Sequence, residues 1–254
     1  MIVLLIASCK KDKEELTGKG SVTMHFDSRF GSDELVFGTD YVTQNGDSVN
    51  LSTFNYYVSN FVLVNENGTE YTVPQDECYH LVRHSDEATH ELTLNNIPAG
   101  KYTAVKFIVG VDSAKSCTSA SARTGDLDVV TNADMYWMWN SGYIFYKMEG
   151  TSPSAPLDTA SGTRMFFYHI GGFGGYSSAT INNIKNISLV APEQILVGEG
   201  HAPEVHTFVD AREVFSSPNM LMIADHPGVM FSSFSTSIAD NYQDMFSINH
   251  VHNE

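Results

Sequence analysis

The amino-acid sequence predicts an all-β fold, a single β-sandwich-like domain with a C-terminal extension. Short segments of alternating apolar and polar residues recur along the chain, which is the pattern of strands with one buried face. Turn sequences such as Asn45-Gly46 and Asn67-Gly68 separate these segments. Apolar residues with helical spacing occur over one or two turns at most, within residues 205–215.

The strongest strand signals place apolar residues on one face of an extended segment, because successive side chains of a strand point to opposite faces. In residues 21–27, Val22, Met24 and Phe26 share a face. The same spacing recurs in two later segments, with Val105, Phe107, Val109 and Val111 in one and Met165, Phe167 and His169 in the other. We therefore expect these three segments to be strands.

The N-terminal segment predicts export and lipid attachment. An apolar run too short to span a bilayer as a helix ends in IASC at residues 6–9, which resembles the bacterial lipobox. Cys9 would then be lipidated and become the first mature residue. We expect residues 1–20 to be a lipoprotein signal and tether, residues 21–190 to form the β domain, and residues 191–254 to be an extension packed on it.

This N-terminus also predicts the location of the protein. A lipid on Cys9 would anchor the chain to the outer membrane of a Gram-negative bacterium, on the periplasmic side or exposed at the surface. In such an oxidising compartment Cys78 and Cys117 could form one disulfide or remain two thiols. Neither cysteine has the spacing of a zinc site.

The composition narrows the classes of partner and activity. The chain has 30 acidic and 14 basic residues, and it lacks the clustered Lys and Arg that bind nucleic acid. No HExxH zinc-protease motif and no GxSxG nucleophile elbow occurs, so the sequence predicts a binding protein and not an enzyme. Acidic loop residues such as Asp126 and Asp128 make calcium a weaker candidate ligand.

Copper is the better-founded ligand. The chain offers 10 histidines and 10 methionines but few thiols, and imidazole with thioether is a ligand set that copper accepts. His169 ends an apolar strand next to a glycine-rich run at residues 171–178, which we interpret as a close backbone approach or a bend at a sheet edge. His250 and His252 lie on one face of an extended segment, where they could share a metal ion or simply point into water.

Both tryptophans of the chain, Trp137 and Trp139, lie in the segment MYWMWNSGYIFY at residues 135–146. In an extended segment Met135, Trp137 and Trp139 would share one face, so core packing is the default interpretation. A second role is open to an indole near copper or a redox partner, because oxidation to kynurenine creates an aryl amine that can bind a metal.

The order of several motifs resembles that of the MbnP family of copper-binding proteins associated with methanobactin systems. The matching stretches are VTMHFD at 22–27, FNYYVSNFVL at 54–63, YHLV at 79–82, IPAGKYTAVKFIVGVDS at 97–113, TGDLD at 124–128, MYWMWNSGYIFYKMEG at 135–150 and YHIGG at 168–172. Together they cover about residues 20–190, and the closing MFSINHVHN is similar to the ending of lipoprotein members.

The resemblance implies an exported β-rich domain that binds copper, in the Cu(I) state. It also implies a partner dihaem enzyme of the MauG or cytochrome c peroxidase type, which would oxidise a tryptophan, here Trp137 or Trp139, to kynurenine. His25, His80 and His169 are the ligands that the resemblance implies. The chain departs from branches of the family that carry a four-cysteine pattern, because only two cysteines follow Cys9.

The sequence therefore predicts a lipoprotein that binds copper for sequestration or delivery. The alternative is a non-metal surface lipoprotein whose sandwich binds glycans or proteins, with the aromatic cluster as core or as a stacking platform.

Overall fold

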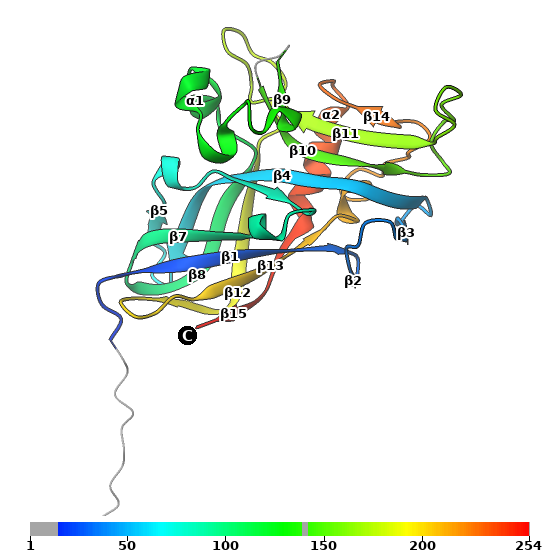
Figure 1. Ribbon diagram of the computed structural model, residues 1–254. Helices are drawn as coiled ribbons and strands as arrows, with labels where there is room; N and C mark the ends of the chain where they lie inside the picture. Colours follow the sequence, from blue (N-terminus) through cyan, green and yellow to red (C-terminus); the bar gives the residue numbers. More distant parts are fainter. Residues whose placement is uncertain (1–14, 139–141, 254) are drawn as a thin grey trace, which may run out of the picture.

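The computed structural model describes residues 15–138 and 142–253 of the 254-residue chain. Two packed β-sheets form a sandwich-like arrangement with few helices, as the sequence predicted (Figure 1). The proposed lipidation residue Cys9 and Trp139 lie outside the described residues. Among the helices of the described part, none is long and apolar enough to cross a membrane.

The smaller sheet has 5 strands, in which β1 lies between β13 and β7, β15 pairs with the far side of β13, and β2 pairs with the end of β1. Its strands are β1 (Lys19–Phe30), β2 (Asp33–Glu34), β7 (Glu91–Pro98), β13 (Glu204–Asp210) and β15 (Phe246–His252). β1 and β13 run parallel, whereas β13 and β15 run antiparallel. We call this the β1 sheet; it lies at the bottom of Figure 1.

The larger sheet has 10 strands, with the order β12-β8-β4-β10-β11-β14 and four short strands attached to β4 and β10. The strands are β3 (Asp40–Val42), β4 (Ser48–Asn65), β5 (Glu70–Thr72), β6 (His80–Arg83), β8 (Gly100–Val109), β9 (Tyr136–Trp137), β10 (Gly142–Thr151), β11 (Met165–Gly171), β12 (Lys185–Val197) and β14 (Gly228–Val229). We call it the β4 sheet, after its longest strand.

Helical segments are short. They are the α-helices α1 (Ser113–Ser116) and α2 (Ser235–Tyr242), and the 3-10 turns η1 (Gln75–Glu77), η2 (Glu87–Thr89), η3 (Ala120–Ala122), η4 (Gly125–Leu127), η5 (Ala133–Met135), η6 (Glu213–Phe215) and η7 (Gln243–Met245). α2 packs against β11 and η6 and buries Ile238, Ala239 and Tyr242.

The main core lies between the two sheets and is rich in aromatic rings. Phe26 of β1 contacts Tyr56 of β4 and Phe107 of β8, with ring centroids 6.4 and 6.5 Å apart in edge-on geometry. Phe246 of β15 meets Phe107 in the same way at 5.2 Å. These contacts join the sheets, since edge-on pairs add to the free energy gained from burying apolar area.

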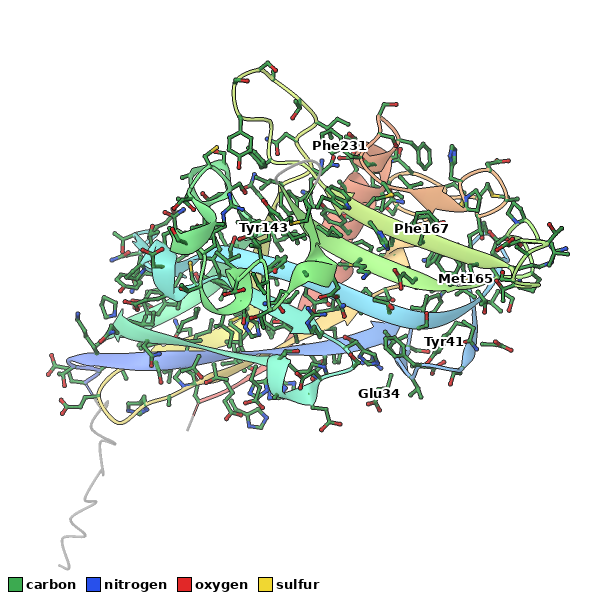
Figure 2. All side chains as sticks on the ribbon, turned by 45° about the horizontal axis from the view of Figure 1, so that its top comes forward. Glu34, Tyr41, Tyr143, Met165, Phe167 and Phe231 are labelled. Carbon is green, nitrogen blue, oxygen red and sulfur yellow. The ribbon has the colours of Figure 1, made fainter. Side chains whose placement is uncertain are left out.

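At the far end of the sandwich a hydroxyl links the short strands. Tyr41, labelled in Figure 2, donates a hydrogen bond from its hydroxyl to the carbonyl oxygen of Glu34 at 3.0 Å and accepts one from the amide of Val36 at 2.8 Å. Its ring stacks on Phe30 of β1 at 4.7 Å. β3 of the β4 sheet is thereby tied to the end of β1.

The predicted strand faces are confirmed. Val22, Met24 and Phe26 are completely buried. The apolar face of β8 is also buried. On β11, Met165, Phe167 and His169 do share a face, but it is the more accessible one, and Phe166, Tyr168 and Ile170 are buried instead. Met165 and Phe167 are labelled in Figure 2.

The helical interpretation of residues 205–215 was wrong for residues 205–210, and only Glu213–Phe215 forms a helical turn, η6. Residues 204–210 form β13, in which Val205, Thr207 and Val209 are buried and the residues between them are more accessible. The buried Thr207 interrupts the apolar alternation, so the sequence pattern resembled a helix. Pairing with β1 on one side and β15 on the other decides the outcome in favour of a strand.

The expected boundary at residue 190 falls inside β12, which runs continuously from residue 185 to 197. The segment that follows contributes β13 and β15, and β13 lies in the interior of the β1 sheet. Residues 191–253 thus pack on the preceding residues as integral strands.

Candidate metal centre

Three histidines lie directly opposite one another on neighbouring strands of the β1 sheet. The register pairs His25 of β1 with His206 of β13, and His206 with His250 of β15. Because the neighbours Met24, Phe26 and Val251 face the core, the three imidazoles point to the outer face of the sheet. His252 lies two residues beyond His250 on that face. We call these four residues the histidine row.

The imidazole rings of the row are in contact. The centroids of the His25 and His206 rings are 4.3 Å apart with 4° between the planes, and those of His206 and His250 are 4.3 Å apart with 9°. His252 closes the end of the stack, 5.5 Å from His206 and 4.8 Å from His250. Directly opposite side chains on paired strands have this spacing, so the strand register creates the row.

Carboxylates surround one end of the row. Glu91 of β7 lies 3.3 Å from His25 Nδ1, and Asp27 lies 3.4 Å from His206 Nδ1. Glu204 Oε2 lies 3.7 Å from His25 Nε2 and 3.9 Å from His206 Nε2. In the described residues, two groups of side chains have ligand atoms within 4.8 Å of one another, and both contain His206.

The two groups are His206, His250 and His252, and His25, Glu204 and His206. Three of the predicted metal residues, His25, His250 and His252, are therefore brought together. The sequence interpretation missed His206, because residues 205–215 were assigned to helical turns. The sequence held no clear signal for the outward face of His206, because Thr207 interrupts the apolar alternation between Val205 and Val209.

His80 is held in a different place. Its Nε2 is 2.7 Å from the carbonyl oxygen of Thr89, and its Nδ1 is 3.1 Å from Asp126. Burial raises the pKa of Asp126, but hydrogen bonds from His80 and from the amide of Leu81 outweigh this effect and lower it. Both nitrogens of His80 thus have protein partners that tie β6 to the loops around it.

His169 pairs with a carboxylate on the outer face of the β4 sheet. Its Nε2 lies 2.7 Å from Glu149 of β10, which also accepts a hydrogen bond from Thr53 at 3.0 Å. Burial lowers the pKa of His169, and the hydrogen bond to Glu149 only partly offsets this shift. The imidazole serves as a partner of Glu149.

The three ligands implied by the family resemblance, His25, His80 and His169, do not share a site. Neither group of potential ligands in the described part of the chain includes His80 or His169. The cause is topological, since His25 lies in the β1 sheet whereas β6 and β11 belong to the β4 sheet. Strand parity shows which face a residue takes, but it cannot show which strands become neighbours.

Trp137 belongs to a second apolar cluster beside β10, at the top of Figure 1. This Trp137 cluster consists of Tyr57, Leu81, Val111, Leu127, Met135, Trp137, Tyr143, Ile144, Phe145 and Phe173. Trp137 is 5% exposed, whereas its neighbour Met138 is 84% exposed. The default interpretation of Trp137 as a core residue is thus supported by its burial.

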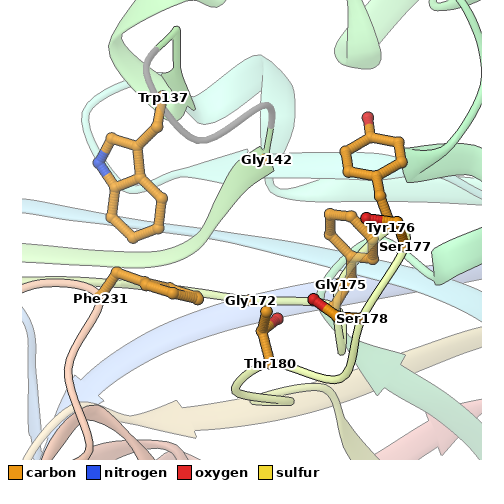
Figure 3. A pocket seen from close by; sticks show the side chains of 10 residues that line it. Trp137, Gly142, Gly172, Gly175, Tyr176, Ser177, Ser178, Thr180 and Phe231 are labelled. Atoms are coloured by element: carbon orange, nitrogen blue, oxygen red, sulfur yellow. The ribbon is translucent and has the colours of Figure 1, made fainter.

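The glycine-rich run explains how the indole fits. A Cβ on Gly171 would lie 2.3 Å from the carbonyl oxygen of Tyr143 and 2.8 Å from the Trp137 ring. Only glycine allows this approach, as the sequence interpretation of a close backbone contact expected. Beyond Gly171 the run lines a cavity of about 190 Å³. Figure 3 shows Trp137 and Phe231 on one side of this cavity, with their ring centroids 6.2 Å apart.

The loop between β8 and β9 covers the Trp137 cluster. Arg123, only 5% exposed, donates hydrogen bonds to the carbonyl oxygens of Ser116 and Thr118 and to the hydroxyl of Tyr136. The Tyr143 hydroxyl donates to the carbonyl oxygen of Leu127 at 2.6 Å. The polar loop is therefore a fixed cover of the cluster.

The structure also shows where the remaining candidate ligands lie, which are two cysteines and two aspartates. Cys78 is buried, Cys117 is exposed, and both are free thiols. Asp126 is engaged with His80, and Asp128 accepts hydrogen bonds from the amides of Val130 and Thr131 at 2.8 Å. Both groups of potential ligands found in the described residues contain histidine, so calcium finds no support, because it prefers oxygen ligands.

Fold and site together define an all-β sandwich protein with a cluster of imidazoles on the outer face of one sheet. The family model of MbnP matches residues 19–231. The chain therefore belongs to the MbnP family, as its motif order suggested.

The structure is similar to that of MbnP from Methylosinus trichosporium, with a TM-score of 0.53 and 16% sequence identity over 79% of this chain and 78% of that chain. At this identity the likeness shows a common fold. No curated protein matches the chain.

Proposed function

We propose that this protein binds copper, as Cu(I), at the histidine row and holds it for sequestration or delivery. The observation that carries the proposal is the contact of four imidazoles, His25, His206, His250 and His252, on the outer face of the β1 sheet. Imidazole nitrogen is a good copper ligand. Membership of the MbnP family supports copper over other metals that imidazole accepts.

The ring contacts support a metal role because they bring ligand atoms of neighbouring imidazoles within 4.8 Å of one another. The row is also accessible, since the side chains of His25 and His206 are 15% and 23% exposed.

The proposal places the protein in the cell envelope of a Gram-negative bacterium, with a lipid anchor at Cys9 and no turnover of its own. The lipobox-like sequence before Cys9 and the charged residues after it support this placement. Metabolic labelling with a radioactive fatty acid tests it. We expect label on the wild-type chain and none on the Cys9→Ala chain.

A copper titration tests the metal proposal. The purified chain is titrated with Cu(I) under reducing, anaerobic conditions against a chromophoric chelator. We expect one equivalent to bind, and we expect His206→Gln to weaken binding by about 100-fold, because a lost ligand costs at least as much as a lost outer partner. The matched control is His169→Gln, which removes an imidazole outside the row. Absence of Cu(I) binding by the wild-type chain would overturn the proposal.

A narrower proposal concerns the tryptophans. We propose that a dihaem partner of the MauG or cytochrome c peroxidase type oxidises Trp137 or Trp139 to kynurenine. The position of Trp137 at the wall of a cavity supports this proposal, because the indole can be reached from that side. Intact-mass spectrometry after co-expression with such an enzyme tests it. If the segment that contains Trp137 and Trp139 keeps its unmodified mass, the proposal is wrong.

The glycan-binding alternative receives less support from the structure. A stacking platform needs an exposed aromatic ring, and Trp137 is only 5% exposed, although Tyr176 at the same cavity is 52% exposed. The cavity beside it, at about 190 Å³, is also smaller than the roughly 300 Å³ at which ligand sites begin.

A further inference from the structure

The row contains two overlapping sets of ligand atoms with different chemistry. One set consists of imidazoles alone, from His206, His250 and His252, and the other adds a carboxylate, from His25, Glu204 and His206. His206 is common to both. This overlap raises the question of whether an ion has one position in the row or two.

The mixed set is arranged around a common point. Glu204 Oε2 lies nearly equidistant from two ring nitrogens, 3.7 Å from His25 Nε2 and 3.9 Å from His206 Nε2. Ligand atoms around a tetrahedral ion with bonds of about 2.0–2.1 Å are roughly 3.3 Å apart. The Glu204 oxygen is thus within about 0.4–0.6 Å of the ligand spacing to each of the two ring nitrogens, and all three ligand atoms lie within 4.8 Å of one another.

A second, independent observation at His25 Nε2 supports the mixed ligand position. This atom is buried and makes no hydrogen bond, although buried polar atoms normally have a partner. Its 3.7 Å separation from Glu204 is too long for a hydrogen bond. This nitrogen lies beside a carboxylate oxygen and a second imidazole, and a metal ion bound to all three would give it the partner that the protein does not provide.

The outer carboxylates orient the rings so that these nitrogens face inward. Glu91 engages His25 at Nδ1, and Asp27 engages His206 at Nδ1. Carboxylates that bind the far nitrogen of a ligand imidazole fix its orientation in many metal sites. His206 thus offers a single nitrogen, Nε2, to both sets, so the two positions cannot be filled at once.

We propose that the histidine row is a two-position site for one ion, with an all-imidazole position for Cu(I) and a mixed position at Glu204 for a divalent ion such as Zn(II) or Cu(II). This inference rests on the proposed copper function for the first position. Three carboxylates, Glu91, Glu204 and Asp27, place negative charge around the second, and this charge favours a doubly charged ion over a singly charged one.

Two single substitutions separate the positions. Glu204→Gln removes the carboxylate and keeps the shape, and His252→Gln removes an imidazole that belongs only to the first set. Both residues are exposed, so neither change disturbs the core. Glu199→Gln is the matched control, because Glu199 is an exposed glutamate outside the row. Each chain is titrated with Zn(II), and separately with Cu(I) under reducing conditions, against chromophoric chelators.

We expect Glu204→Gln to weaken Zn(II) binding by about tenfold or more and to change Cu(I) binding by less than about twofold. His252→Gln should show the reverse, and the control should match the wild-type chain. Cu(I) should displace Zn(II) at one ion per chain, and Cu(II) bound to the wild-type chain should show two coordinating nitrogens by electron paramagnetic resonance.

The outcomes distinguish this inference from the proposed function. If both substitutions weaken both metals equally, or if Zn(II) and Cu(I) bind together at two ions per chain, the two-position inference fails and copper binding stands. If the wild-type chain binds Zn(II) but not Cu(I), the proposed function fails and the two-position site with it.

Discussion

On the outer face of the β1 sheet four imidazoles lie in contact, partly exposed, and one of their nitrogens has no hydrogen-bond partner. At the end of the β4 sheet Trp137 lies among apolar and tyrosine side chains, covered by a loop that Arg123 holds in place. Each region drew attention in the sequence through an uncommon side chain, histidine in the first and tryptophan in the second. In the histidine row the polar atoms remain available to a ligand, whereas in the Trp137 cluster the ring is used for packing.

The comparison teaches that concentration of a residue type does not by itself identify a site. His80 and His169 also look like metal ligands in the sequence, yet neither belongs to a group of potential ligands in the described residues. The histidine row differs because paired strands place its imidazoles opposite one another, with ligand atoms within 4.8 Å. The distinction between the two regions predicts that they respond independently to substitution, metal and pH.

The largest expected effect is a loss of stability when Trp137 is replaced. Trp137→Ala removes a buried ring and should lower the free energy of unfolding by about 3–5 kcal/mol. Cu(I) affinity should stay within about twofold, because the row is on the other sheet. Urea unfolding and the copper titration measure the two quantities, with Met138→Ala, at an exposed neighbour, as the control. A large loss of Cu(I) affinity in the unmodified protein would instead make Trp137 part of the copper site.

The second-largest expected effect is the stabilisation of the folded chain by Cu(I) bound at the histidine row. Cu(I) at 100 times its dissociation constant should raise the free energy of unfolding by about 2.7 kcal/mol, since it binds the folded chain alone. Thermal unfolding should show this gain in the wild-type chain and not in His206→Gln. Hydrogen exchange should slow in β13 and β15. Protection that appears in β9 and β10 instead would move the copper site to the Trp137 cluster.

The third effect tests the backbone contact that admits the indole. Gly171→Ala forces a Cβ against the Tyr143 carbonyl and the Trp137 ring, and should cost about 1–3 kcal/mol of stability. Gly198→Ala is the matched control, since its new Cβ would meet neighbours at an ordinary 3.4 Å. Denaturant unfolding compares the two chains. Equal stability of both would show that the indole can shift at no cost.

The smallest effect is a pH dependence at His80 and Asp126. The folded pKa of Asp126 is below its usual 3.8, so the ion pair contributes stability above that pH and loses it as the pH falls through the folded pKa. Partial exposure and screening limit the contribution to about 1 kcal/mol. Urea titrations near pH 6 and near pH 3 should show a smaller loss for Asp126→Asn than for the wild-type chain. An unchanged loss would exclude Asp126 as its source.

Much of the fold could be predicted from the sequence, because strand alternation is a local property. Val22, Met24 and Phe26 are buried as their spacing required, and the close approach at Gly171 followed from the glycine-rich run. β13 could not be predicted with the same rule, because Thr207 is buried among apolar residues. β13 forms a strand because it pairs with β1 and β15, which are distant from it in the sequence.

The sequence by itself determined which side each histidine takes. His250 and His252 had to share a face, and His25 had to lie opposite Met24 and Phe26. Only the tertiary structure decided that β1, β13 and β15 are neighbours and that His25, His206 and His250 fall in one register. The physical reason is that side-chain alternation is set within a strand, whereas strand order and register depend on how distant apolar faces close one core.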